Sequence, residues 1–172
     1  MRSLVVEPPS GGGSDIAEGG AVGTLKRRDG YERMLGELKK QHHEACVFNR
    51  QTSVIPDLPV WFDRAGVLHG TFTATELQQG YRGRMHGGVA AAIIDAAMAQ
   101  CLMGHGICGY TVELSVKYRK PVLLHMPSRV RAWITGTSIG CLYEMKCEIH
   151  QGHTRVVGAS GRFYRQHSDR MP

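Results

Sequence analysis

The chain has 172 residues, of which 42% are hydrophobic, a length and composition typical of one globular domain with a hydrophobic core. It carries 21 Lys and Arg against 15 Asp and Glu, which gives a formal net charge of +6. This excess is small and scattered, and neither zinc-finger spacing nor an RNA-binding aromatic signature accompanies it, so we expect no nucleic-acid partner. A ligand that carries phosphate groups fits the charge at least as well.

Five cysteines are spread along the chain without a CxxC pair. An odd number of cysteines in apolar elements predicts free thiols in a reducing compartment, and the N-terminus has no compact apolar signal region. The apolar run after Gly88 stops at Gly104, short of the roughly 20 residues that span a bilayer, and it contains Asp95. We therefore expect a cytoplasmic protein with no membrane partner, in which this run is a core helix.

The N-terminal part of the chain has a different composition from the rest. Residues 1–24 are rich in glycine and proline and have little to bury, so we expect them to be disordered or loosely attached. Residues 25–65 are predicted to form a helix and an irregular lead-in. Asp29 is placed to cap that helix, which runs to about His43, and Pro56 interrupts regular structure beyond it.

Residues 66–166 hold the predicted folded domain. Its expected elements are a helix over 87–103 and strands over 68–74, 111–118, 128–137, 142–150 and 154–165. In the strand predicted over 111–118, alternation puts Val112, Leu114, Val116 and Tyr118 on one face. It puts Thr111, Glu113, Ser115 and Lys117 on the opposite face. Because the later strands are joined by short turns and the helix is too apolar for a surface, we predict an α+β architecture. A long central helix is wrapped by a curved antiparallel sheet of five to six strands.

The most informative stretch is the glycine-rich turn that ends in His86, Gly87 and Gly88 and leads directly into the apolar helix. Asp95 lies inside that helix, nine residues after His86. An ionisable residue in an apolar helix is costly unless it is paired or used in chemistry. Backbone N–H groups at a helix start attract negative charge. Together these features point to an acid or base near an oxyanion site.

The HGG turn, the acidic residue nine positions after its histidine and the strand TVELSVKYRKP resemble the hot-dog fold thioesterases. The most similar group is the PaaI-like acyl-CoA thioesterases, which includes thioesterase superfamily member 2, and the resemblance covers about 66–165. It implies the hot-dog fold, homodimers that pair their sheets edge to edge and often double into homotetramers, and active sites at the dimer interface. The implied reaction is hydrolysis of an acyl-CoA thioester, with no metal and no cofactor.

The resemblance also implies roles for individual residues. Asp95 matches the catalytic carboxylate, as general base or nucleophile, and Gly87 matches the glycine whose N–H polarises the thioester carbonyl. His86 matches the histidine that shapes the turn and contacts the carbonyl or water. Thr111 matches a Ser/Thr that holds the attacking water.

Substrate-binding residues follow in the same way. Thioesterase superfamily member 2 has an asparagine six residues before the histidine, where this chain has Gly80. The neighbouring Gln79 is the candidate to supply the side-chain amide instead. Gly88 belongs to the same turn. The candidates for binding the phosphates of coenzyme A are the cationic residues near the motif, Arg82, Arg84, Arg119 and Lys120.

Other interpretations of these residues stay open at this point. Asp95 can be a helix carboxylate bonded to a neighbouring hydroxyl, His86 a structural turn histidine and Thr111 an ordinary strand residue. A noncatalytic acyl-CoA binding or sensing module of the same fold is the alternative function, and a dehydratase is a third. The sequence leaves the acyl preference and the choice between dimer and tetramer open.

Overall fold

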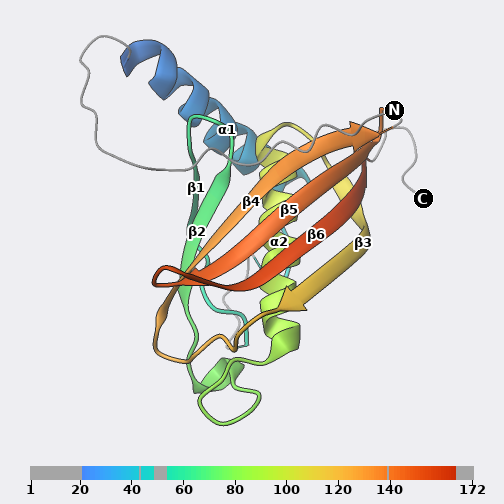
Figure 1. The fold of residues 1–172 in the computed structure, drawn as a ribbon. Coiled ribbons are helices and arrows are strands. Elements are labelled where there is room, and N and C mark those ends of the chain that lie inside the picture. Colours follow the sequence, from blue (N-terminus) through green and yellow to red (C-terminus); the bar gives the residue numbers. More distant parts are fainter. Residues whose placement is uncertain (1–20, 43, 49–53, 139, 166–172) are drawn as a thin grey trace.

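The computed structural model describes residues 21–42, 44–48, 54–138 and 140–165. It contains two α-helices, a short 3-10 helix and six strands (Figure 1). In chain order these are α1 (Ala21–His42), β1 (Val60–Phe62), β2 (Leu68–Thr73), η1 (Glu76–Gln78), α2 (Gly87–Gly104), β3 (Gly109–Tyr118), β4 (Pro127–Ser138), β5 (Leu142–Gln151) and β6 (Thr154–Arg165).

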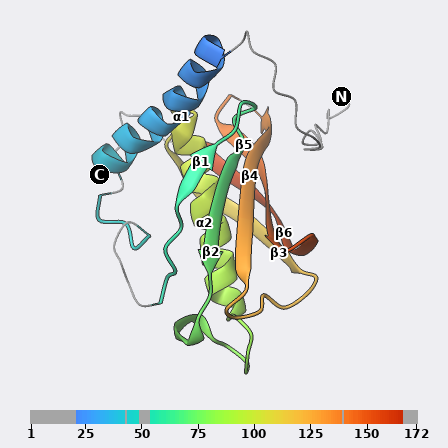
Figure 2. The same ribbon diagram turned by 90° about the vertical axis from the view of Figure 1, so that its left-hand side faces the viewer.

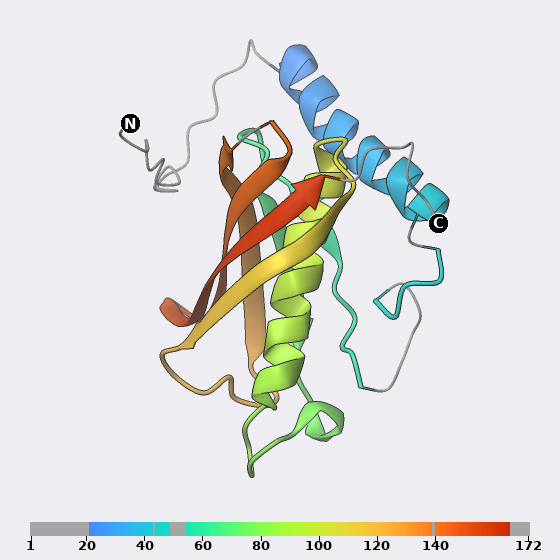
Figure 3. The same cartoon turned by 90° about the vertical axis from the view of Figure 1, so that its right-hand side faces the viewer.

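The six strands form one antiparallel sheet in the order β1-β2-β4-β5-β6-β3. The strand that follows α2 in the sequence therefore lies at the far edge of the sheet, beside β6. The sheet curves around α2, which lies along its concave side (Figure 1, Figure 3). The predicted α+β hot-dog architecture is confirmed.

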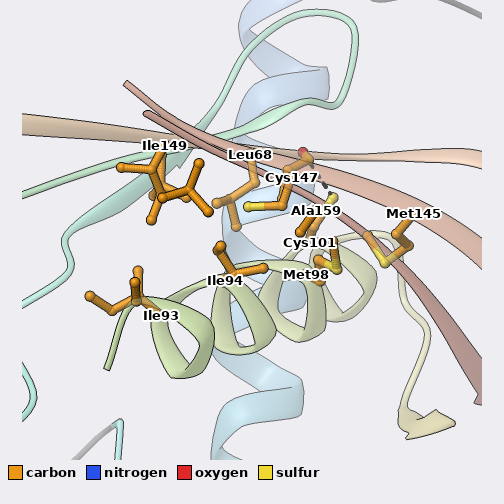
Figure 4. Packing of buried hydrophobic residues seen from close by; sticks show 14 of the residues in the cluster. Leu68, Ile93, Ile94, Met98, Cys101, Met145, Cys147, Ile149 and Ala159 are labelled. Atoms are coloured by element: carbon orange, nitrogen blue, oxygen red, sulfur yellow. Dashed lines mark hydrogen bonds between the residues drawn. The ribbon is translucent and has the colours of Figure 1, made fainter. Parts of the chain in front are cut away.

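The core lies between α2 and the sheet. Ile94, Met98 and Cys101 point from α2 toward the strands and are completely buried (Figure 4). Opposite them, Met145 and Cys147 of β5 are also buried, at no more than 1% exposed. Burying each large aliphatic side chain contributes about 1.5–3 kcal/mol, so this one side of α2 supplies much of the stability of the domain.

Helix α1 crosses the C-terminal end of α2 (Figure 2). Tyr31 of α1 stacks on Phe62 of β1, with ring centroids 5.3 Å apart, and contacts His105 at 4.7 Å. The last residue of α2 is Gly104, and a Cβ atom there would overlap the ring of Phe62. The absence of a side chain at Gly104 therefore allows β1 and α1 to close over the end of the core.

The N-terminal half differs in detail from the sequence prediction. Helix α1 begins at Ala21, so Asp29 lies within it rather than at its cap, and residues 21–24 belong to this helix. The lead-in ends in strand β1, which pairs with β2 through Val60 opposite Gly70, so the sheet starts before residue 66. Pairing with β2 is a long-range contact that local composition does not reveal. Residues 1–20, His43 and 166–172 lie outside the described residues.

Helix α2 is the one helix among the described residues that is long and apolar enough to cross a membrane by length and composition. The domain itself buries 61% of it. This burial accounts for its apolar composition, as expected for a core helix.

Candidate active site on the open side of helix α2

Asp95 lies on the side of α2 that borders the edge strand β3. Its neighbours Ile94 and Ala96 are buried, whereas Asp95 is only half-buried. The hydroxyl of Thr111 donates a hydrogen bond to Oδ1 of Asp95 at 2.7 Å. The carboxylate is therefore oriented by one hydrogen bond and still open to a water or a ligand.

A β-bulge brings Thr111 to this position. In β3, Thr111 pairs with Phe163, but Glu113 pairs with Arg162, so the register shifts between them. Strict alternation would put Thr111 on the same face as Glu113, as the sequence predicted, and that prediction was wrong. The extra residue reverses the alternation and turns Thr111 toward α2, an effect that bulges often have beside functional sites.

At the start of α2 the backbone N–H of Gly87 has no acceptor among the described residues, whereas that of Gly88 has one. His86 is the N-cap of α2, and its Nδ1 atom accepts a hydrogen bond from the N–H of Gly88 at 3.0 Å. Because Nδ1 is the acceptor, the proton of the neutral ring is on Nε2. The N–H of Gly87, the first residue of the helix, has no acceptor within the helix. The N–H of Gly87 is therefore the donor suited to an oxyanion, because the N–H of Gly88 is already bonded to His86.

Tyr118 holds the carbonyl group of Gly87, and the sequence did not predict this contact. Its hydroxyl donates a hydrogen bond to the carbonyl oxygen of Gly87 at 2.7 Å. Burial raises the pKa of Tyr118, so this hydroxyl stays protonated and keeps its donor role. The available signal was the alternation of β3, which puts Tyr118 on the side of the sheet that faces α2.

The loop before the turn is tight at Gly80, the position where the family places an asparagine. A Cβ atom on Gly80 would lie 3.0 Å from Cα of His86. Beside it, Oε1 of Gln79 accepts a hydrogen bond from the N–H of Gly83 at 2.8 Å. The amide oxygen of Gln79 therefore holds the loop in shape.

The four cationic candidates lie on two segments that contact each other. Arg82 and Arg84 are exposed on the loop before α2, and Arg119 and Lys120 are exposed just after β3. The two segments meet where the N–H of Met85 donates to the Val122 carbonyl at 2.9 Å and that of Leu124 donates to Gly83 at 3.2 Å. Arg119 also borders a hollow of about 570 Å³ on the outer face of the sheet, together with Lys117, Trp133, Lys146, Arg155 and others.

Asp95 and Gly87 of one chain cannot act on the same atom. They lie eight residues apart on one helix, which corresponds to roughly 12 Å along its axis. A carboxylate and an N–H donor that share one carbonyl group must approach it from opposite sides within hydrogen-bonding distance. Within a single chain, the carboxylate of Asp95 and the N–H of Gly87 are therefore too far apart to act on one carbonyl group.

Strand β3 forms one edge of the sheet and presents large apolar side chains. Tyr110 and Val112 are 59% and 61% exposed, and Tyr118 is 53% exposed. The strand is 10 residues long, whereas β1 at the opposite edge has only three. A long, apolar, unpaired edge favours association with another strand.

A cavity of about 70 Å³ lies beside Asp95. Helix α2 supplies one wall, and α1 with the segment that follows it supplies the other. Its lining residues are Asp95, Ala96, Ala99, Gln100, Met103, Lys39, Cys46 and Phe48.

The cysteines are poor candidates for nucleophiles in the core. All five are free thiols. Burial raises the pKa of Cys101 to about 12 and raises that of Cys147 further, so both stay protonated near neutral pH. The thiol of Cys101 donates to the carbonyl of Ala132 at 3.4 Å. These two residues therefore pack as small apolar side chains.

Residues 82–157 match the family model of the thioesterase superfamily. Over these residues the chain is similar to the thioesterase superfamily, and its fold is the hot-dog fold. A search of curated protein sequences finds no match. The matched segment contains all four candidate catalytic residues, Asp95, Gly87, His86 and Thr111.

Solved structures of thioesterases share this fold. The Escherichia coli PaaI protein of the phenylacetic acid degradation operon has a TM-score of 0.65 and 13% identity, covering 81% of this chain and 96% of its own. A hypothetical thioesterase from Streptococcus pneumoniae TIGR4, solved with coenzyme A, has a TM-score of 0.59 and 18% identity, covering 63% and 88%. The smu.793 protein of Streptococcus mutans UA159, bound to acetyl CoA, has a TM-score of 0.60 and 14% identity, covering 70% and 96%. The resemblance to PaaI-like thioesterases is confirmed at the level of the fold.

Proposed function

We propose that the protein is an acyl-CoA thioesterase, which hydrolyses an acyl-coenzyme A to a free acid and coenzyme A. The observation that carries this proposal is the hydrogen bond from Thr111 to Asp95, at the open side of the central helix of a thioesterase domain. A half-buried carboxylate with one oxygen held by a hydroxyl has its other oxygen available for water or for the thioester carbon. A module that only binds acyl-CoA has no use for this arrangement.

In the proposed reaction, the N–H of Gly87 donates a hydrogen bond to the thioester carbonyl oxygen. Negative charge develops on this oxygen as the carbonyl carbon is attacked, so a preorganised donor stabilises the transition state more than the ground state. Loss of one such donor typically costs about 3–4 kcal/mol. Tyr118 holds the adjoining carbonyl group and so keeps the first turn of α2 in place.

Asp95 acts in one of two ways. As a general base it takes a proton from water, whose oxygen adds to the carbonyl carbon, and the C–S bond then breaks to release the thiolate of coenzyme A, which takes up a proton. As a nucleophile its oxygen adds to the carbonyl carbon, and the C–S bond breaks to release the thiolate of coenzyme A, which takes up a proton, and to leave an acyl-carboxylate anhydride. Water hydrolyses this anhydride in a second step to the free acid and the regenerated carboxylate of Asp95. Both routes use the carboxylate oxygen that Thr111 leaves free.

The structures of related proteins support the pairing of Asp95 with Thr111. Two further structures of the Streptococcus pneumoniae protein carry alanine in place of an aspartate and of a threonine, and these two positions are sixteen apart. Asp95 and Thr111 are also sixteen residues apart. The first structure of that protein holds coenzyme A, which is in line with an acyl-CoA ligand here.

We propose that the active enzyme is a homodimer, or a homotetramer built from such dimers. The separation of Asp95 from Gly87 along one helix is resolved if each carboxylate faces the Gly87 of a partner subunit. The exposed edge strand β3 offers the surface for this association because its backbone and its apolar side chains are unpaired within the chain.

The phosphates of coenzyme A require cations near the mouth of the site, and Arg82, Arg84, Arg119 and Lys120 are the candidates. Their two segments are hydrogen-bonded to each other, so they form one cationic rim. The proposed compartment is the cytoplasm, because free thiols are typical of proteins in a reducing environment.

The test is a hydrolysis assay with a panel of short, long and aromatic acyl-CoAs, in which release of the free thiol of coenzyme A is followed. We expect turnover of at least one thioester well above the rate without protein. Tight binding of acyl-CoA without hydrolysis would select the sensing module instead and would contradict the enzyme.

A further inference from the structure

The outer face of the sheet, opposite to α2, is hollowed. In β5 the core residues Met145 and Cys147 alternate with Lys146 and Glu148, so the latter two lie on the outer face. A hollow of about 570 Å³ lies there, bordered by residues of β3, β4, β5 and β6. This volume is within the range of about 300–1,000 Å³ that is typical of small-molecule sites. The described residues that line the hollow include none from α2, so it is separate from the proposed active site.

The strand register brings small and long side chains together in this hollow. Ser160 of β6 lies opposite Lys146 of β5 on one side and opposite Ser115 of β3 on the other. Two residues away on β6, Gly158 lies opposite Lys117 of β3. The middle of the hollow therefore has small residues, and the two lysines lie on strands that are roughly 10 Å apart. Because lysine side chains are long and flexible, both can reach a ligand that lies over β6 between them.

Positive charge dominates the lining of the hollow. The charged residues that line it are four cations and one carboxylate, namely Lys117, Arg119, Lys146, Arg155 and Glu148. Glu148 already forms an ion pair with Arg155. Lys117, Arg119 and Lys146 form no ion pair with a carboxylate in the part of the chain that the structure describes. Three positive charges without a partner therefore face the same hollow.

The surroundings of the hollow add to this charge. On β4, Arg131 lies opposite Glu148, and together with Arg129 it borders a second hollow of about 210 Å³ on the same face. Glu113 and Glu144, by contrast, border a separate hollow farther along the strands. Cations therefore outnumber carboxylates around the first hollow, and a bound anion would offset their mutual repulsion.

We propose that this hollow binds the diphosphate group of a small molecule. A terminal diphosphate group carries about three negative charges near pH 7, which matches the three unpaired cations, whereas a single phosphate group carries about two. Lysine and arginine donate charge-assisted hydrogen bonds to phosphate oxygens, and the hydroxyl groups of Ser115 and Ser160 are further donors in the middle of the hollow. The inference does not rest on the proposed thioesterase function, in which Lys117 and Lys146 have no part.

The experiment is a calorimetric titration of the full chain with inorganic phosphate, inorganic pyrophosphate and ADP, at low ionic strength and without divalent cations. We expect pyrophosphate, ADP or both to bind at one site per chain at least tenfold more tightly than phosphate, because they neutralise more of the positive charge. The two diphosphates distinguish the sources of the group. Equal affinities identify the diphosphate alone as the recognised group, and tighter binding of ADP identifies a nucleoside diphosphate.

Charge substitutions locate the site. Lys146→Gln and Lys117→Gln each remove one unpaired cation, so each should weaken the binding at least fivefold. Lys40→Gln makes the same change of charge at an exposed position of α1 and is the matched control, which should leave the affinity unchanged. Melting temperatures show whether each variant is folded, and if one of the two lysine variants does not fold, the other decides.

The inference is overturned if pyrophosphate and ADP bind no more tightly than phosphate. It is also overturned if a folded lysine variant of the hollow keeps the full affinity. Arg84→Gln tests the proposed rim for coenzyme A, and loss of pyrophosphate binding in this variant alone would assign the anion to that rim instead. Hydrolysis of acyl-CoA is measured separately, so failure of the thioesterase function and failure of this site are distinguishable.

Discussion

The two sides of helix α2 have opposite chemistry. On the side that faces the middle of the sheet, Ile94, Met98 and Cys101 are completely buried. On the other side, Asp95 is half-buried and bonded to Thr111. The two sides of the helix therefore have different roles. Burial of one side stabilises the fold, and the other side carries the groups proposed for catalysis. Substitutions on the two sides should therefore affect different measurements.

The largest effect on activity is expected for Asp95→Asn. This change keeps the size of the side chain and removes the negative charge, so turnover should fall at least 100-fold, in line with loss of a general base. The melting temperature should change little because the side chain is half-buried. The measurement is release of free thiol from the best acyl-CoA, and activity near that of the unmodified protein would remove Asp95 from the mechanism.

The neighbouring residue on the sheet side should behave in the opposite way. Ile94→Ala leaves a cavity in a fully buried position and should lower the free energy of unfolding by about 2–5 kcal/mol. Denaturant unfolding measures this change, with Val89→Ala on the same helix, which is only partly buried, as a milder control. A loss below 1 kcal/mol would mean that the sheet side of α2 is packed more loosely than the structure indicates.

Thr111 tests whether the bulge in β3 matters for function. Thr111→Val keeps the shape of the side chain and removes the hydrogen bond to Asp95, so kcat/KM should fall about tenfold, as expected for a hydrogen bond to a charged group. Ser115→Val in the same strand is the control, because Ser115 lies on the outer face of the sheet and should have no effect. Equal effects of the two substitutions would argue against a special role for Thr111.

A smaller effect is expected for Tyr118→Phe. Loss of the hydrogen bond to the Gly87 carbonyl should loosen the first turn of α2 and lower kcat about threefold, with the substrate affinity nearly unchanged. Steady-state kinetics separates kcat from KM. A change in KM alone would assign Tyr118 to binding rather than to positioning the turn.

Thiol labelling gives the smallest but most direct comparison. Near pH 8, Cys46 should react with a thiol reagent in the folded protein, because it is only partly buried, whereas Cys101 should not, because burial raises its pKa to about 12. All five cysteines should react after unfolding. Mass spectrometry of the labelled peptides reads out the pattern, and fast labelling of Cys101 in the folded protein would contradict the packing described above.

Much of the fold and part of the site were predictable from the sequence. The apolar periodicity of α2 and the alternation in β5 and β6 predicted those elements because both patterns come from local backbone geometry. The spacing of Asp95 after His86 predicted the candidate site for the same reason, since both residues belong to one helix and its cap. The start of α1 and the existence of β1 were not predicted, because tertiary packing on Phe62 and pairing with β2 decide them.

The sequence by itself determined the order of helix and strands in the domain, the apolar central helix and the presence of a carboxylate behind a glycine turn, because each depends on contacts within one element or between neighbouring ones. Only the tertiary structure decided that a bulge turns Thr111 to Asp95, that His86 occupies the N–H of Gly88, and that α1 forms a wall of the cavity with Gln100. These features depend on the register of one strand against another and on helices distant in the sequence. No local pattern of residues encodes such contacts.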